Sequence, residues 1–516
     1  MGTKRIAINV MATSMQTAVS FIVGVFSSRW AYNALGETQF GLFAVVGAVI
    51  AFIAIINNAT INASSRFFSY AVGHQRDPNS EKELLCKWFN TALSVQLILP
   101  IILILIGGPL GIYYVLYYLE IPDDSLRMPC VWVFVLSLFT MFQTMLFSPV
   151  QSLYYAMQYI FVRNIVAICN TFLMAAGGWW LLHYEGNRFL TWAVFCAAVA
   201  LLNNIVFVLI AYWQFPAARI RLKYWFDRKR LTEMLSFSSF GLVGDLGALF
   251  SNSGVAIVLN KFLGPAANAA MSIGNQVNQK INIFSQAFTG AIQPELITRV
   301  GAGDFDGAQR LAHRACFYSY SLSLLFVAPF MVYAQKLLVL WFKSPPVHAS
   351  EIAVIMMASL LVERVTVGYY MLVTASGRIK VYTTTLGIGN AGRCFIVLAL
   401  LWWGLPLIPT LWLGLFLPLF ILNQCRVLFA KYTLGAQVSI RHYLKKILLP
   451  VSAMSLISIM FSFSFKTLYG DGVFAMLMCL TINILIVAIL FWLLVGSDER
   501  KILLSKITPA INLFRH

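Results

Sequence analysis

The sequence predicts an all-α polytopic membrane protein, and three observations lead to this class. Hydrophobic residues make up 60% of the 516-residue chain and charged residues only 11%, whereas soluble proteins typically carry about 25% charged residues. The apolar runs are long and do not alternate with polar residues, so they do not suit a membrane β-barrel. Because lipid offers the backbone no hydrogen-bond partner, such runs must be helical.

The apolar runs predict about 14 transmembrane helices, arranged as two pseudo-symmetric six-helix lobes plus two C-terminal helices. The first run follows Lys4 and Arg5 and continues to Tyr32 without an A-x-A cleavage site, so we expect a retained helix. The expected spans are 5–32, 38–71, 85–118, 128–156, 160–183, 189–214, 235–260, 266–298, 307–342, 350–375, 380–403, 407–430, 443–465 and 472–495.

Basic residues gather on one side of the predicted membrane. Most of the 37 Lys and Arg residues fall in the termini and in one alternate set of loops. The positive-inside rule therefore predicts that both termini are cytoplasmic. This distribution also accounts for the net charge of +18, so we expect no nucleic-acid partner. The opposite loops carry only Arg127, Arg188, Lys261, Lys343 and Lys466.

The two most basic loops, 215–233 and 426–446, divide the spans as six, six and two. Both loops suit topology determinants that lie on anionic lipid headgroups. They equally suit a surface that gathers an anionic lipid diphosphate, and the sequence leaves both interpretations open. The expected domains are an N-terminal lobe at 1–214, a basic cytoplasmic linker at 215–234, a C-terminal lobe at 235–433, and two extra helices with a cytoplasmic tail at 434–516.

An internal repeat supports the two lobes. With an offset of 228 residues, Gly36 falls on Gly264, each inside a Leu-Gly pair, and Gly73 falls on Gly301. A spacing of six helices preserves orientation, so we expect parallel repeats related by an axis along the membrane normal. This arrangement suits alternating access around a central cavity.

Motifs for nucleotides and metals fail their context tests. Gly387, Gly389 and Gly392 spell G-x-G-x-x-G inside an apolar span, which favours close helix packing or a kink over a dinucleotide site. The chain has no Walker sequence, no H-E-x-x-H and no C-x-x-C, and its eight cysteines lie mostly in apolar segments. We therefore expect no metal, no cofactor and no catalytic residue. The driving force would be an ion gradient, the membrane potential or the substrate gradient.

Cations inside the spans are the main candidates for substrate contact. An ionisable residue in the membrane is costly and faces a cavity or a partner. Clustered cations attract an anion strongly, and Arg makes bidentate contacts with a diphosphate. For Arg29 and Arg66, the alternative is that they lie near enough to helix ends to reach water. The predicted cavity cations are Arg29, Arg66, Lys280, Arg364 and Arg393.

Acidic and amide side chains complete the predicted site. Asp245 and Glu363 are candidate counter-ions or coupling carboxylates. Because Glu363 adjoins Arg364, we expect the two to point different ways and to pair with different helices. Amides in span eight recur every three or four residues, so they share one stripe, which would be costly against lipid. Amides suit sugar hydroxyls, and the predicted sugar path is Asn275, Asn278, Asn282 and Gln286.

Two stretches carry a family resemblance. They read KFLGPAANAAMSIGNQVNQKINIFSQAFTGAIQPELITRVGAGD from Lys261 to Asp304, and RWAYNALGETQFGLFAVVGAVIAFIAIINNATINASSRFFSYAVG from Arg29 to Gly73. Both resemble the oligosaccharide flippases of the polysaccharide transporter family, in the multidrug/oligosaccharidyl-lipid/polysaccharide exporter superfamily. The resemblance implies a V-shaped bacterial inner-membrane transporter. It would move an undecaprenyl-diphosphate oligosaccharide to the outer leaflet for surface polysaccharide synthesis.

The same resemblance implies basic cavity residues in spans one, two and eight, which here contain Arg29, Arg66 and Lys280. The implied partners are the lipid-linked oligosaccharide, anionic membrane lipid, and the polysaccharide polymerase and glycosyltransferases of the pathway. Three alternatives remain. They are a multidrug extruder of the same superfamily, a flippase for the peptidoglycan precursor, and a membrane-embedded enzyme, which the short outer loops disfavour.

Overall fold

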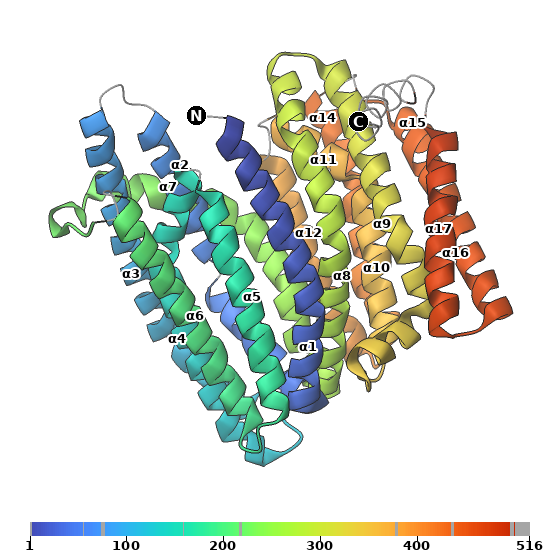
Figure 1. Cartoon of the computed structure of the whole chain (residues 1–516), viewed down its shortest axis with the longest axis horizontal. Coiled ribbons are helices and arrows are strands. Elements are labelled where there is room, and N and C mark those ends of the chain that lie inside the picture. Colours follow the sequence, from blue (N-terminus) through green and yellow to red (C-terminus); the bar gives the residue numbers. More distant parts are fainter. Residues whose placement is uncertain are drawn as a thin grey trace, which may run out of the picture. The chain divides into compact units, whose positions relative to one another are not determined.

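The computed structural model describes residues 3–54, 56–73, 78–157, 159–215, 219–376, 380–434, 438–495 and 500. Within these ranges every regular element is helical (Figure 1). Eleven of the described helices are long and apolar enough to cross a membrane. The number is twelve if α10 (Ala349–Val365) and the bent continuation α11 (Val367–Ala375) form one span. The predicted all-α polytopic class is confirmed.

The remaining elements follow the expected spans closely. Two helices make up the second predicted span, 38–71. These are the C-terminal part of α1 and then α2. The other long helices are α1 (Thr3–Ile53), α2 (Ile56–Gly73), α3 (Pro78–Tyr117), α4 (Arg127–Ala156), α5 (Ile160–Leu182), α6 (Arg188–Gln214), α7 (Arg228–Leu249), α8 (Val255–Gly301), α9 (Phe305–Phe342), α12 (Lys380–Trp402), α14 (Leu417–Leu434), α16 (Leu449–Tyr469) and α17 (Val473–Leu494). The short α13 (Leu407–Leu411) and α15 (Ile440–Tyr443) precede α14 and α16.

Two of the long helices are interrupted by a glycine at corresponding positions. Gly36 in α1 has φ 73° and ψ 174°, and Gly264 in α8 has φ 74° and ψ −174°. This backbone region is essentially restricted to glycine. Dividing α1 and α8 at these breaks turns the twelve spans into the fourteen segments that the sequence predicts. The two glycines also keep the 228-residue offset of the repeat, so their predicted equivalence is confirmed in backbone conformation.

The G-x-G-x-x-G segment serves helix packing. A Cβ atom on Gly247 of α7 would lie 2.2 Å from the carbonyl oxygen of Gly387 in α12. Two helix backbones therefore touch at this point, and a larger residue at 247 would force them apart. The predicted close packing is confirmed at Gly387.

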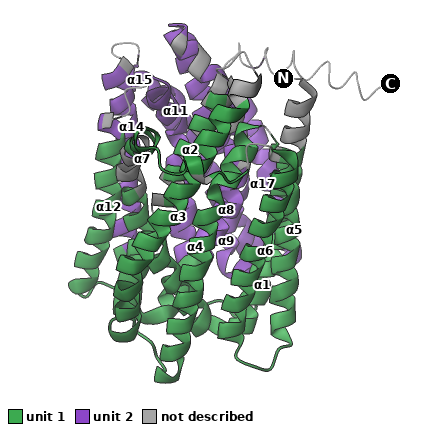
Figure 2. Cartoon of the chain, turned by 90° about the vertical axis from the view of Figure 1, so that its left-hand side faces the viewer, with its two compact units in different colours: residues 1–272, 341–349, 383–410 green, residues 273–340, 350–382, 411–516 purple. Residues whose placement is uncertain are grey.

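The chain divides into two compact units (Figure 2), one of residues 1–272, 341–349 and 383–410, and the other of residues 273–340, 350–382 and 411–516. The segment 341–349 joins the first unit through aromatic contacts with α1. The ring of Phe342 packs edge-on against Tyr32 with centroids 5.2 Å apart, and the Trp341 indole N–H donates to the Val25 carbonyl at 2.7 Å.

The first unit contains two hydrophobic cores. One joins α1, α3, α4, α5 and α6 around the fully buried Phe134 and Phe189. The other joins α2, α3, α4, α5, α6 and α7 around Phe68, Phe89 and Tyr154. These cores hold the helices of the N-terminal repeat around α4, which contributes to both.

A buried amide ties the last two helices to α9. Pro329 has no N–H, so the carbonyl of Leu325 lacks its helical donor. The side-chain amide of Asn483 in α17 donates to this carbonyl at 3.0 Å, and its oxygen accepts from the hydroxyl of Ser458 in α16. Asn483 is fully buried and thereby joins three helices at one point.

Replacing Asn483 by Leu should lower the melting temperature of the purified protein. The change leaves the Leu325 carbonyl and the Ser458 hydroxyl without this partner in a buried site, at a cost of about 1–3 kcal/mol for each group. Thermal unfolding in detergent measures the effect. Asn423→Leu is the matched control. Asn423 is almost equally buried, but among the described residues its amide bonds only its own helix and its Oδ1 has no partner, so its loss should be nearly neutral. Equal losses in both variants would contradict this account.

Candidate functional site

Two of the three best candidate cations lie half-buried in the interrupted helices. Arg29 precedes the Gly36 break of α1 by seven residues, about 10 Å along the axis. Lys280 follows the Gly264 break of α8 by sixteen residues, about 24 Å along the axis. Lys280 therefore lies deep inside its span, whereas Arg29 lies about two turns from the end of its helical segment. A charge within a span requires a polar environment.

The other cations and Asp245 have different surroundings. Arg393 in α12 is half-buried, and its guanidinium donates to the Asn390 side chain at 3.4 Å. Arg66 lies in α2 and Asp245 in α7, but both side chains fall outside the described residues. The roles predicted for these residues remain predictions.

Arg364 and Glu363 pair with each other. Arg364 is only 4% exposed, and its guanidinium lies 3.0 Å from the Glu363 carboxylate. The expectation that each pairs with a different helix is wrong for this contact. Adjacent positions differ by about 100° around a helix, and the long Arg side chain is able to span that angle. The pair stands at the end of α10, just before the chain bends by 48° into α11.

The amide side chains in the α8 stripe differ in their contacts. The Asn278 amide donates to the backbone carbonyl of Met356 in α10 at 2.9 Å, so this residue fastens two helices of the second unit. Asn275 and Asn282 are half-buried, and Gln286 is exposed. Interhelical bonding thus accounts for Asn278, whereas Gln286 is accessible.

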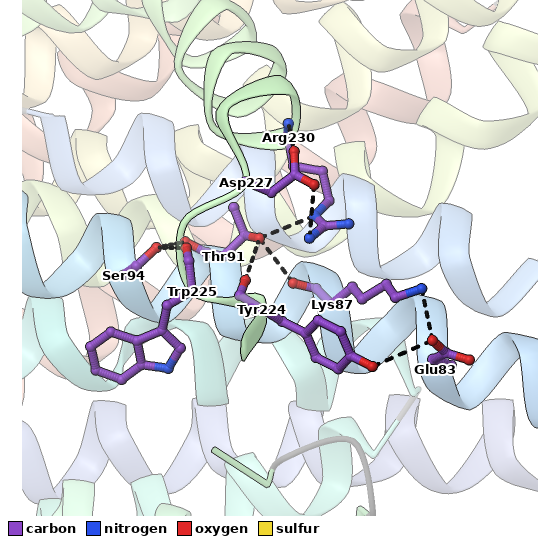
Figure 3. Close-up of polar contacts among 8 residues, drawn as sticks. All are labelled: Glu83, Lys87, Thr91, Ser94, Tyr224, Trp225, Asp227 and Arg230. Atoms are coloured by element: carbon purple, nitrogen blue, oxygen red, sulfur yellow. Dashed lines mark hydrogen bonds and ion pairs between the residues drawn. The ribbon is translucent and has the colours of Figure 1, made fainter. Parts of the chain in front are cut away.

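The basic linker is fastened to α3 by a row of polar side chains (Figure 3). In α3, the Asn90 amide donates to the Arg219 carbonyl at 3.1 Å and accepts from the Arg221 backbone N–H at 2.7 Å. One turn further along, the Ser94 hydroxyl donates to the Trp225 carbonyl at 2.7 Å. The linker backbone therefore runs along α3 in a fixed register.

Charged side chains also join the linker to α3, where the Arg230 guanidinium donates to the Thr91 hydroxyl at 3.2 Å (Figure 3). Lys87 pairs with Glu83 at 2.8 Å, and the Tyr224 hydroxyl also reaches Glu83 at 3.4 Å (Figure 3). Asp227 caps the start of α7, where its carboxylate accepts from the backbone N–H of Arg230 at 3.0 Å. This hydrogen bond lowers the pKa of the Asp227 carboxyl. The last residues of the linker therefore form the first turns of α7, behind a cap that remains ionised at neutral pH.

Replacing both Asn90 and Ser94 by Ala should expose the linker to trypsin, which cleaves after its Arg and Lys residues. The double variant loses three hydrogen bonds of about 0.5–1.5 kcal/mol each, so we expect cleavage at least about tenfold faster, the ratio that corresponds to 1.4 kcal/mol. Thr232→Ala is the control, because the Thr232 hydroxyl bonds only its own helix. A linker cleaved at the same rate in the double variant would show that these bonds do not hold it.

Sequence reasoning missed this attachment, since it treated the linker as a loop defined by charge alone. A signal was present in α3, where Asn90, Thr91 and Ser94 interrupt an otherwise apolar run on neighbouring faces. The same type of signal, a lone Asn in a very apolar helix, marks Asn483.

Comparison with solved structures defines the class of fold. An inward-facing multidrug resistance MATE family transporter of the MOP superfamily matches with a TM-score of 0.62 at 12% identity, covering 81% of this chain and 95% of that chain. The lipid II flippase MurJ in an inward closed conformation matches with a TM-score of 0.61 at 14% identity, covering 95% and 99%. A MOP superfamily transporter from Pyrococcus furiosus gives 0.58 at 13%, covering 84% and 96%. The chain is a multi-pass membrane protein with the fold of these transporters.

The sequence itself then places the chain in a family. Residues 3–297, more than half of the chain, match the polysaccharide biosynthesis protein family, and the chain belongs to that family. The resemblance inferred from the two stretches around Gly36 and Gly264 is thereby confirmed. No curated protein matches the chain.

Proposed function

We propose that this protein is a non-enzymatic flippase for an undecaprenyl-diphosphate-linked oligosaccharide. It would move the headgroup from the cytoplasmic to the outer leaflet of a bacterial inner membrane, with both termini in the cytoplasm. The observation that carries the proposal is the excess of cations over carboxylates within the spans of a chain of this family. An anionic headgroup is the substrate that such a charge balance favours. The cations are Arg29, Arg66, Lys280, Lys336, Arg364 and Arg393, and the carboxylates are Asp245, Glu295 and Glu363.

The headgroup would meet these cations in turn as it crosses. Arg29 lies about 10 Å from its glycine break and Lys280 about 24 Å from the equivalent break. By the predicted topology, Arg66 lies toward the cytoplasmic end of its span, Lys280 near the middle of its span and Arg29 toward the outer end of its span, so all three would contact the diphosphate during transport. The polyprenyl tail would stay in lipid throughout, because its transfer to water would be costly.

The sugar would follow the accessible part of the α8 stripe. Asn275, Asn282 and Gln286 offer amide donors and acceptors that suit hydroxyl groups. Asn278 would hold α8 on α10, since its amide donates to the Met356 carbonyl at 2.9 Å. Arg364, Arg393 and the carboxylates of Asp245 and Glu363 would balance the charge of the substrate and of a coupled ion.

Two six-helix lobes would rock about this path. We assign them to 1–214 and 235–433, joined by the linker at 215–234, with the last two helices at 434–516 as an addition to the second lobe. The equivalent breaks at Gly36 and Gly264 support this two-fold plan. The fixed register of the linker on α3 would let it move with the first lobe.

Deleting the gene tests the proposal in a host without a redundant flippase. We expect complete lipid-linked repeat units to accumulate on the inner leaflet while surface polysaccharide disappears, and the intact gene to reverse both changes. The second candidate is a drug extruder, which the similarity of the fold to MATE transporters favours. Unchanged surface polysaccharide together with sensitivity to cationic drugs would support that candidate and contradict ours.

A further inference from the structure

A pocket in the second unit lies where α16 meets α9 and α10. It encloses about 520 Å³, within the range of about 300–1,000 Å³ typical of small-molecule sites. None of the predicted substrate residues lines it. The side chains that define this α16 pocket are Met331, Val354, Ile459, Phe463, Lys466 and Asp471.

The walls of the α16 pocket are apolar. Met331, Val354 and Ile459 are half-buried, and Phe463 at its edge is 62% exposed. In a membrane protein, apolar side chains exposed at the surface of a span face lipid tails. The pocket is therefore suited to receive a hydrocarbon chain from the bilayer.

Two side chains of opposite charge, Lys466 and Asp471, lie beside these apolar residues. The Lys466 ammonium lies 3.2 Å from the Asp471 carboxylate, donates to the Val332 carbonyl at 3.1 Å, and lies 5.6 Å from the centre of the Tyr333 ring. These contacts fix the ammonium at the distortion of α9 at Tyr333. The Lys466 and Asp471 side chains are still 33% and 57% exposed, so both remain open to a ligand.

The charge pattern selects the headgroup. A diphosphate would gain from Lys466 but would be repelled by Asp471 at almost the same distance. A cationic drug would meet the reverse situation. A phospholipid with a phosphate and a primary ammonium satisfies both groups at once, because its phosphate accepts from Lys466 and its ammonium donates to Asp471. Its acyl chain would fill the apolar part of the pocket.

We propose that the α16 pocket binds a zwitterionic phospholipid with an ethanolamine headgroup, which stabilises the contact of the last two helices with α9. The proposal is independent of the transported substrate. A choline headgroup has no N–H to donate to Asp471 and an anionic glycerol headgroup has no positive charge, so both should bind less tightly. One partly exposed ion pair is worth at most about 1 kcal/mol.

The test uses the full-length protein, purified in detergent and stripped of lipid. Ethanolamine, choline and glycerol phospholipids with identical acyl chains are added in mixed micelles, and thermal stabilisation reports binding. We expect half-maximal stabilisation at an ethanolamine lipid concentration about fivefold below that for the other two. Equal concentrations for the three headgroups, or a lower concentration for the choline or glycerol lipid, would overturn the proposal.

Two variants separate the headgroup from the acyl chain. Asp471→Asn, in an exposed turn, should remove the preference for ethanolamine over the anionic lipid. Phe463→Ala should weaken binding of all three lipids while keeping their order. Glu120→Gln is the matched control, since Glu120 pairs with Lys261 at 3.0 Å in a similarly exposed ion pair elsewhere in the chain. An unchanged lipid order in Asp471→Asn would overturn the assignment of Asp471.

Discussion

Replacing Lys280 by Ala should reduce flipping at least about tenfold while the amount of protein in the membrane stays the same. Lys280 is half-buried deep in α8, and we propose that it binds the diphosphate. A hydrogen bond to a charged group is worth about 1.5–3 kcal/mol, and each 1.4 kcal/mol is a factor of ten. Arg66→Ala should act in the same direction. Lipid-linked oligosaccharide on each leaflet and surface polysaccharide are measured in a host that lacks the gene.

Two further variants test whether the loss of flipping depends on a positive charge at position 280. Lys280→Arg keeps the cation and should retain most of the activity. Lys343→Asn removes an exposed cation from a loop, and Asn tolerates the φ of 66° found there, so transport should be normal. Normal flipping by Lys280→Ala, at an equal protein level, would exclude Lys280 from the substrate path.

Gly264→Ala should destabilise the protein by about 1–3 kcal/mol, and Gly36→Ala by a similar amount. Both glycines have φ near 74° with ψ near 180°, where a Cβ atom is strained whatever space surrounds it. The break must remain for the chain to turn back between consecutive spans. We therefore expect a lower melting temperature for each variant in detergent.

Gly392→Ala is the control for this prediction. Gly392 lies inside α12, its φ is not positive, and a Cβ atom there would meet open space. Alanine is favoured over glycine in a helix by about 0.5–1 kcal/mol, so this variant should be slightly more stable. A Gly264→Ala protein as stable as Gly392→Ala would show that the break is not required in the folded state.

Much of the fold was predictable because membrane spans are defined by length and hydropathy. The repeat could be found because Gly36 and Gly264 occupy a backbone region that is essentially restricted to glycine, so both copies keep a glycine there while the flanking apolar residues differ in identity. The distribution of Lys and Arg likewise predicts the side of the membrane on which each loop lies, since this distribution depends on the composition of the loops and not on helix packing.

The missing details depend on contacts between distant residues. The bond from Asn483 to Leu325 exists because Pro329 frees a carbonyl in another helix, and no spacing in the sequence joins the two. The pairing of Arg364 with Glu363 depends on the rotamer of a long side chain, which the order of residues does not specify. For the candidate site, Arg29 and Lys280 are half-buried and their contact with the substrate stays a prediction, while Asn278 bonds α10.

The central claim is tested most directly with the purified protein in liposomes that contain a polyprenyl-diphosphate oligosaccharide with a fluorescent sugar. A membrane-impermeant quencher reports which leaflet holds the headgroup. We predict that the wild-type protein moves the inaccessible half to the quencher, and that the Lys280→Ala protein does so at least about tenfold more slowly. Liposomes in which the wild-type protein leaves that half protected, while it transports a cationic drug, would contradict the flippase assignment.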